Sequence, residues 1–83
     1  MSARIHKHRI SALGLHRVDG HARTIGTDPD GDLAVWFETD VVPSHFWVLF
    51  TGEEVPWGAR VISTTTHDGL VYHLAVSVER GES

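Results

Sequence analysis

Large apolar residues occupy every second position along several short stretches of this chain. The alternation is clearest over residues 32–39, 44–51 and 69–79. A period of two is what a strand with one buried face requires, because successive side chains of a strand point to opposite sides. Val, Ile, Thr and aromatic residues, which favour strands, dominate the same stretches. The pattern therefore predicts an all-β chain.

Turn residues divide the chain into short segments of similar length. We predict one hairpin turning at residues 28–31 (Asp-Pro-Asp-Gly) and another at residues 67–69 (His-Asp-Gly). A chain of 83 residues suffices for a single β domain, 1–83. The predicted fold is a small antiparallel β-sandwich or flattened barrel of six to seven strands, placed at 4–10, 13–18, 22–28, 32–39, 44–51, 59–66 and 69–79.

The chain also resembles itself at an offset of 37 residues, which relates segment 8–39 to segment 45–76. Each segment would contain a strand, a connector and a hairpin. We therefore predict two similar β units with pseudo-twofold symmetry. The ungapped part of the match places Ala22, Arg23, Ile25, Thr27 and Leu33 on Ala59, Arg60, Ile62, Thr64 and Leu70.

The second face of the predicted strands is not polar. A sheet needs only one buried face, so either two sheets close on each other or the second apolar surface meets a partner or another copy of the chain. We expect part of this surface to serve self-association or partner binding. Its residues are Ala34, Trp36, Trp47, Leu49, Val71, His73 and Ala75.

Charge is unevenly distributed, since five of the seven basic residues precede residue 28 and ten of the eleven acidic residues follow residue 27. The basic first segment can lie beside acidic later strands or meet an acidic partner. Nucleic acid is disfavoured as a partner, because this segment has no aromatic residue and the net charge is −4. Protonation of all seven His would change that charge to +3, which predicts pH-dependent folding or solubility.

The chain has no Cys, so a disulfide framework and a thiolate metal site are both excluded. No apolar run is long enough to span a membrane, and the first residues lack the apolar region of a signal peptide. Motifs of nucleophilic catalysis and phosphate binding are absent as well. We expect a cytoplasmic protein with no cofactor and no enzymatic activity.

His6 and His8 are weak candidates for metal ligands. Residues i and i+2 of a strand face the same side, so both imidazoles could bind one ion, with His45 or His73 as a third ligand. The basic residues beside them oppose a cation. Residues 28–32 resemble part of a calcium loop, but the Gly stands at loop position four instead of six, so a hairpin turn is the better interpretation.

Trp57, Trp36, Trp47 and His73 are the candidate partner-binding residues. Indole rings contribute strongly to protein cores and to binding hot spots. We expect Trp36 and Trp47 to share a face, and Trp57 to lie in a loop over 52–58, where it either anchors the loop or contacts a partner. His73 lies in mid-strand among apolar neighbours, a position typical of a hydrogen-bonded core histidine.

Four motifs occur in a fixed order along the chain: Ile5-His6-Lys7-His8, Leu33-Ala34-Val35-Trp36, Phe50-Thr51-Gly52-Glu53-Glu54-Val55-Pro56 and Gly69-Leu70-Val71-Tyr72-His73-Leu74. In this order they resemble a family of short, uncharacterised domains of actinobacterial phages and their hosts. The resemblance covers about residues 4–78 and departs at His6 and His8, where aromatic residues are usual. It implies a phage-encoded accessory protein, with no catalytic residue and no cofactor.

These observations favour a small non-enzymatic accessory protein that binds another protein, with a host factor met during infection as the expected partner. Two alternatives stay open. One is a metal- or small-ligand-binding domain that uses its histidines, and the other is a structural homodimer.

Overall fold

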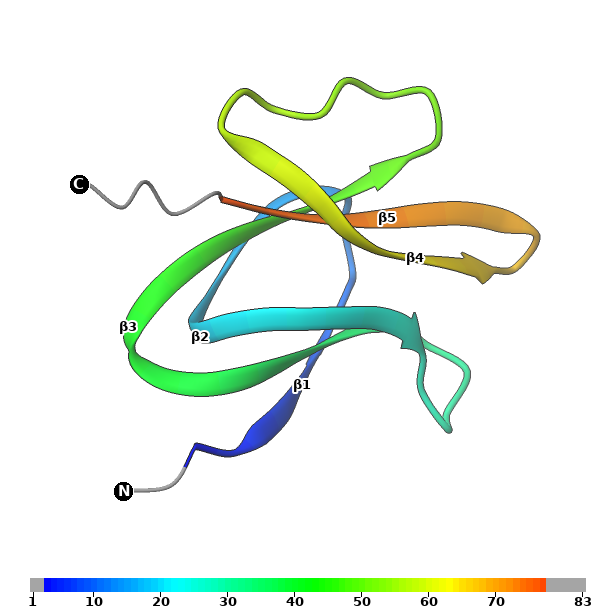
Figure 1. The fold of residues 1–83 in the computed structure, drawn as a ribbon. Coiled ribbons are helices and arrows are strands. Elements are labelled where there is room, and N and C mark those ends of the chain that lie inside the picture. Colours follow the sequence, from blue (N-terminus) through cyan, green and yellow to red (C-terminus); the bar gives the residue numbers. More distant parts are fainter. Residues whose placement is uncertain (1–2, 78–83) are drawn as a thin grey trace.

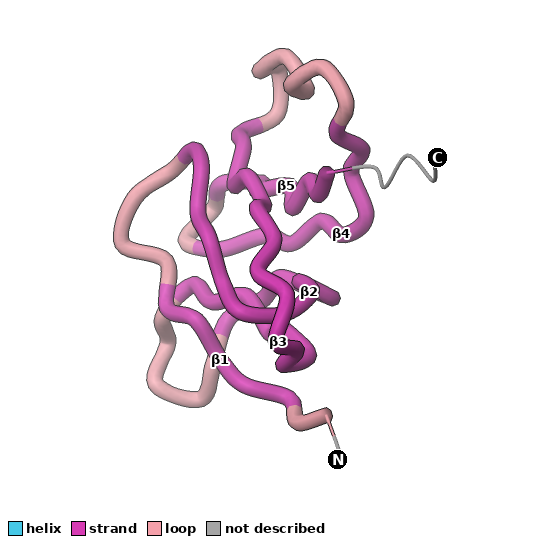
Figure 2. Tube along the Cα trace, turned by 90° about the vertical axis from the view of Figure 1, so that its left-hand side faces the viewer, coloured by secondary structure: helices cyan, strands magenta, loops and turns pink. Residues whose placement is uncertain are grey.

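The computed structural model describes residues 3–77, and these form a five-stranded antiparallel sheet without a helix (Figures 1 and 2). The all-β prediction is therefore confirmed. The strands are β1 (Ile5–Arg9), β2 (Gly14–Thr27), β3 (Leu33–Phe50), β4 (Ala59–His67) and β5 (Leu70–Ser77).

The long strand β3 organises the sheet. It pairs with β2 along nearly its whole length, with β1 through its first half and with β5 through its second half. The strand β4 pairs with β5 and completes the order β1-β3-β5-β4. In Figure 1, β3 bends back on itself, so that its two halves run through opposite sides of the molecule.

The structure has fewer strands over 3–77 than the six to seven expected. The predicted strands 13–18 and 22–28 are one strand, β2, and the predicted strands 32–39 and 44–51 are one strand, β3. The sequence predicts strand ends at the turn residues Asp19, Gly20 and Pro43, but these lie opposite each other, since Asp19 pairs with Pro43 and Gly20 with Thr39. Two facing irregularities make a bulge, which bends both strands without ending either. The predicted residues 78 and 79 of the last strand lie outside the described range.

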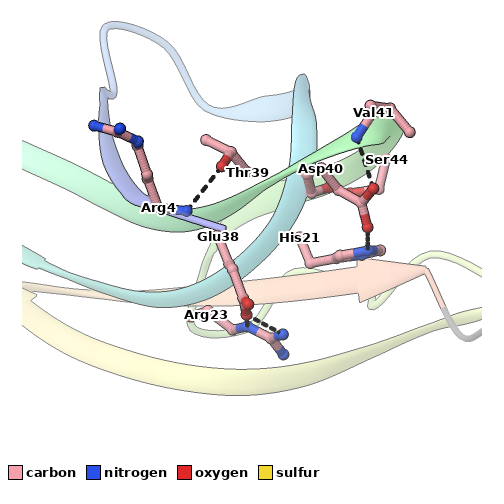
Figure 3. A network of polar contacts seen from close by, with 9 residues as sticks. Arg4, His21, Arg23, Glu38, Thr39, Asp40, Val41 and Ser44 are labelled. Carbon is pink, nitrogen blue, oxygen red and sulfur yellow. Dashed lines mark hydrogen bonds and ion pairs between the residues drawn. The ribbon is translucent and has the colours of Figure 1, made fainter. Parts of the chain in front are cut away.

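Polar contacts fix this bend (Figure 3). Ser44 Oγ donates a hydrogen bond to the carbonyl oxygen of Gly20 across the bulge. On the other edge of β3, Thr39 N donates to Arg4 O at 2.8 Å, and Arg4 N donates to Thr39 Oγ1 at 3.0 Å. Asp40 accepts from Val41 N at 2.6 Å, and this contact, before all others, lowers the pKa of the Asp40 carboxyl.

The core lies inside the bend. Its four largest fully buried side chains are Phe46, Leu74, Val35 and Val48, from β3 and β5. They belong to the alternating sets that predict strands in the sequence. Because both halves of β3 contribute, the core depends on the bend that brings those halves together.

The edges of β2 and β4 meet through side chains. Ser63 Oγ lies 3.0 Å from Thr24 Oγ1 and accepts a hydrogen bond from Ile25 N at 3.2 Å. Thr27 Oγ1 lies 2.9 Å from His67 Nδ1 further along. Both strands carry a register shift close to the Ser63 contact, in the steps Ala22 to Thr24 and Val61 to Ser63. The sheet therefore curls until these edges touch but is not closed by strand pairing.

The first hairpin turn is built around the carboxylate of Asp28, which is buried. Asp28 Oδ1 accepts hydrogen bonds from the backbone N–H groups of Asp30 and Asp32, both at 2.9 Å. Asp28 Oδ2 accepts from Lys7 Nζ at 2.8 Å, which ties the turn to β1. This carboxylate thus serves the turn itself, as the hairpin interpretation of residues 28–32 requires.

Gly20 is required at the bend. Its φ of 145° is accessible to glycine, and a Cβ there would lie 2.0 Å from the backbone oxygen of Glu38. We expect Gly20→Ala to lower the free energy of unfolding by about 3 kcal/mol or more, measured by urea denaturation. Gly26→Ala is the matched control, since its Cβ would meet only Trp36 Cζ3 at 3.5 Å, and it should cost less than about 1 kcal/mol. Equal losses in the two variants would contradict the account of the bend.

Asp28 makes stability depend on acid. The hydrogen bond from Lys7, followed by that from Asp32 N, lowers the pKa of Asp28. A lowered folded-state pKa means that the carboxylate stabilises the fold fully above about pH 4 and loses this effect as the pH falls through the folded value. We expect Asp28→Asn to destabilise the chain at pH 7, with a difference from the native chain that shrinks below pH 4 in thermal unfolding. Asp30→Asn, an exposed change in the same turn, is the control, and a difference independent of pH would refute this role.

Candidate functional site

An apolar row crosses the outer face of the sheet, on the side opposite the core. Trp47 of β3 is paired with Leu15 of β2 and with Ala75 of β5, and Ala75 is paired in turn with Val61 of β4. Directly paired residues of an antiparallel sheet point to the same side. Four strands therefore contribute one row of apolar side chains, with Trp47 in its middle.

Exposure differs between the centre and the ends of this row. Ala75 is buried and Trp47 is half-buried, whereas Leu15 is 58% exposed and Val61 is 41% exposed. The centre is therefore packed and holds its shape, while both ends offer apolar surface to solvent. Such a surface is typical of a contact site on a rigid support.

His73 lies beside this row and is hydrogen-bonded at both ring nitrogens. Its Nε2 is 2.7 Å from Thr51 Oγ1, and its Nδ1 is 2.9 Å from Thr64 Oγ1. The residue is half-buried and paired with Leu49, which is buried. Because its polar atoms are already satisfied, His73 fastens the loop after β3 to β4 instead of presenting a nitrogen to a ligand.

The loop between β3 and β4 folds over the end of the row. Glu53 pins the start of the loop, since its carboxylate accepts from Phe50 N at 2.8 Å and its own N–H donates to Phe50 O at 3.2 Å. Val55 then lines a hollow together with Leu49, Val61 and His73. We call Leu15, Trp47, Leu49, Val55 and Val61 the outer patch.

Trp57 is 92% exposed on this same loop. A turn holds its neighbours, with Ala59 N donating to Pro56 O at 3.0 Å and Gly58 at a φ of 82°. Most of a large indole therefore meets solvent on a segment whose backbone is fixed at both ends. The sequence leaves open whether Trp57 anchors the loop or contacts a partner, and the structure exposes the indole on the surface of the loop.

Trp36 lies elsewhere. Its register partners are Lys7 and Thr24, on the half of β3 that pairs with β1, and its ring lies over Gly26. Both Trp36 and Trp47 point away from the core, but the bend of β3 separates them. Strand alternation places both indoles on the outer face of β3, on different halves of the strand and beside different neighbouring strands.

The histidines predicted as metal ligands are not gathered into one cluster. Within residues 3–77, no group of three or more His, Cys, Asp or Glu side chains is placed to hold a metal ion. His6 lies against Phe37, with ring centroids 6.0 Å apart, whereas His8 contacts Phe46 and His16. The neighbour of His8 is thus His16 of β2, a residue that the sequence interpretation did not single out.

Leu15, Val55 and Val61 are the further residues that the sequence interpretation missed. Leu15 and Val61 become neighbours of the Trp47 row only through the register of four strands. No local pattern in the sequence carries that register. Val55 adjoins Trp57 in the sequence, so its place in the same loop was the one available signal.

The chain matches no protein-family model, and comparison with curated proteins and with solved structures gave no match either. In the part of the chain that the structure describes, no helix is long and apolar enough to cross a membrane.

The His8 ring gives a second source of pH dependence. Its burial, and then the charge of the nearby His16, lower the pKa of His8. Because the folded-state pKa lies below the unfolded value of about 6.5, the stabilisation by neutral His8 is complete above that pH and is lost as the pH falls through the folded value. We expect stability in urea to fall from pH 7 to 5, and His8→Phe to reduce this slope. Equal slopes in the native chain and in His8→Phe would refute the assignment.

Proposed function

We propose that this chain is a non-enzymatic module that binds another protein through the outer patch and Trp57. The observation that carries the proposal is the 92% exposure of the Trp57 indole on a loop pinned beside exposed apolar side chains. Burial of such an apolar surface against a partner lowers the free energy, which favours association.

The fixed backbone around Trp57 favours binding. A side chain held on an ordered loop loses less conformational freedom on association than one on a flexible loop. Indole rings are the side chains most enriched among residues that dominate binding energy. Trp57 is therefore the proposed anchor, and the outer patch is the apolar surround that excludes water from it.

Acidic residues near the outer patch indicate which charge the rim of the partner's binding surface would carry. Glu53 and Glu54 are both exposed on the loop that carries Trp57. We propose a partner surface with an apolar pocket for the indole and basic residues at its rim, because opposite charges at a rim speed association and select the partner. The resemblance to phage domains points to proteins of an actinobacterial host as the class in which to seek it.

We also propose that the curled sheet is a flattened barrel of two similar β units. The approach of β2 to β4 through Ser63 and His67 supports the barrel. The presence of one hairpin in each of segments 8–39 and 45–76 supports the paired units. In this arrangement the outer patch faces solvent, where a partner can reach it.

Partner capture tests the proposed function. We expect the native chain, immobilised and exposed to actinobacterial lysate, to retain a protein that Trp57→Ala and Val61→Asp bind at least about tenfold more weakly. Val41→Asp is the matched control, because Val41 is 86% exposed at the bend and lies outside the patch. Trp36→Phe should also bind normally.

Two outcomes would contradict the proposal. One is equal retention by the native chain and all variants, and the other is no retention by the native chain. Sedimentation equilibrium on the native chain and on Trp57→Ala tests the alternative occupant of the outer patch, which is a second copy of the chain. A dimer that Trp57→Ala dissociates would assign the patch to self-association.

A further inference from the structure

A groove opens where the edges of β2 and β4 part. The side-chain contacts that join the two strands begin at Thr24 and Ser63 and continue to Thr27 and His67. In Figure 1, β4 begins at the upper left, away from β2, and the two strands approach each other toward the right. The groove between their separated parts has a volume of about 750 Å³, which is a size typical of binding sites.

The edges of β2 and β4 that face this groove take no part in strand pairing. Over the described residues, β2 pairs with β3 alone and β4 pairs with β5 alone. The N–H and C=O groups along such a free edge can pair with an extended chain, which then adds itself as a further strand. Ser63 fills the gap where the strands meet, since its Oγ accepts from Ile25 N. Residues 21–23 and 60–62 border the groove before that contact.

The side chains that line the groove are basic or neutral. Arg23, Arg60, His21 and His45 contribute to it, and no Asp or Glu is among the lining residues that the structure describes. The whole chain, in contrast, carries eleven acidic residues and seven Lys or Arg. The groove therefore differs in charge from the rest of the molecule and favours an acidic ligand.

Arg60 is a cation that such a ligand can reach. The guanidinium of Arg23 already donates to Glu38 Oε1 through Nε at 3.1 Å and through Nη2 at 2.6 Å (Figure 3). His21 is paired with Asp40 at 3.3 Å in the same way. The Arg60 side chain is exposed and forms no ion pair within residues 3–77. Its charge is therefore available to a carboxylate from another molecule.

The position of Arg60 in the sheet is unusual for a charged residue. It is paired with Val76, and Val76 is paired with the core residue Phe46, so the three side chains share the inner face. Burial of a charge on this face would be costly, but the groove keeps Arg60 in contact with solvent. Val61, the next residue, points outward into the outer patch. The groove and the outer patch thus lie on opposite faces of β4.

Apolar side chains lie beside these charges. Val42 from the bend of β3 is 58% exposed, and Ile62 of β4 is 37% exposed. Pro43 and the half-buried Val76 extend the same lining. A ligand that carries both acidic and apolar side chains therefore matches the groove better than a purely anionic one.

We propose that this groove binds an extended acidic segment of another protein, which adds to the free edge of β4 and places a carboxylate on Arg60. Apolar side chains of the segment pack against Ile62 and Val42. Hydrogen bonds between a carboxylate and a guanidinium are stronger than those between neutral groups, which makes Arg60 the main polar anchor. The proposal does not depend on the outer patch or on Trp57.

Fluorescence anisotropy with a labelled synthetic peptide tests the site at neutral pH and low ionic strength. The probe alternates Glu and Val, and a second probe carries Lys in place of each Glu. We expect saturable binding of the acidic probe alone. Arg60→Gln should weaken it about tenfold or more. Arg17→Gln, which changes an exposed arginine of β2 outside the groove, is the matched control and should bind as the native chain does.

A second pair of variants tests the apolar lining. Ile62→Ser should weaken binding of the acidic probe about threefold or more. Val71→Ser is its control, because Val71 is 38% exposed on β5 and lies outside the groove. Trp57→Ala should bind the probe normally, so failure of the groove and failure of the outer patch are distinguished.

Strand addition has a readout of its own. Methylation of alternate backbone nitrogens removes the N–H donors from one edge of the probe, and one of the two possible sets should weaken binding about tenfold or more. The unmodified probe should also slow amide exchange over residues 59–62. No binding of the acidic probe to the native chain, equal binding of both probes, or unchanged affinity in Arg60→Gln would overturn the proposal. Equal affinity for the unmodified probe and both methylated forms would overturn the added strand.

Discussion

The bend in the middle of β3 is the constraint on which the other features of this molecule depend. At that point the backbone of β2 approaches the backbone of β3 so closely that a side chain at Gly20 would meet the Glu38 carbonyl oxygen at 2.0 Å. The bend lets one strand contribute Val35 from its first half and Phe46 from its second half to the same core. A small domain has little apolar area to bury, so the contribution of both halves of one strand to a single core matters for its stability.

The second half of β3 also separates the core from the outer patch by alternation alone. Phe46 points inward, where it fixes the rings of His8 and His16. Trp47, the next residue, points outward and centres the apolar row that ends at Leu15 and Val61. The core and the proposed docking surface are thus on opposite faces of one strand, and the packed core keeps the docking surface rigid.

Local sequence patterns predict the strands and the hairpin turns of this fold. The period of two identified the inner residues of β3 and β5, and the turn residues located both hairpins, because these features depend on neighbouring positions only. Asp19, Gly20 and Pro43 predict strand ends in the sequence. Their pairing across β2 and β3, which makes them a bulge instead, depends on contacts between distant residues. The same limit applies to the site: the side-chain types of Trp47 and Trp57 point to them in the sequence, whereas Leu15 and Val61 join the outer patch only through register between distant strands.

Hydrogen–deuterium exchange of the chain, free and bound to its captured partner, tests most directly whether the outer face with Trp57 is the docking surface. We expect slower exchange on binding in the loop 51–58 and in the first residues of β4, with exchange at the bend around residues 39–43 unchanged. Protection confined to β1 and the bend, with the loop exchanging as in the free chain, would contradict it.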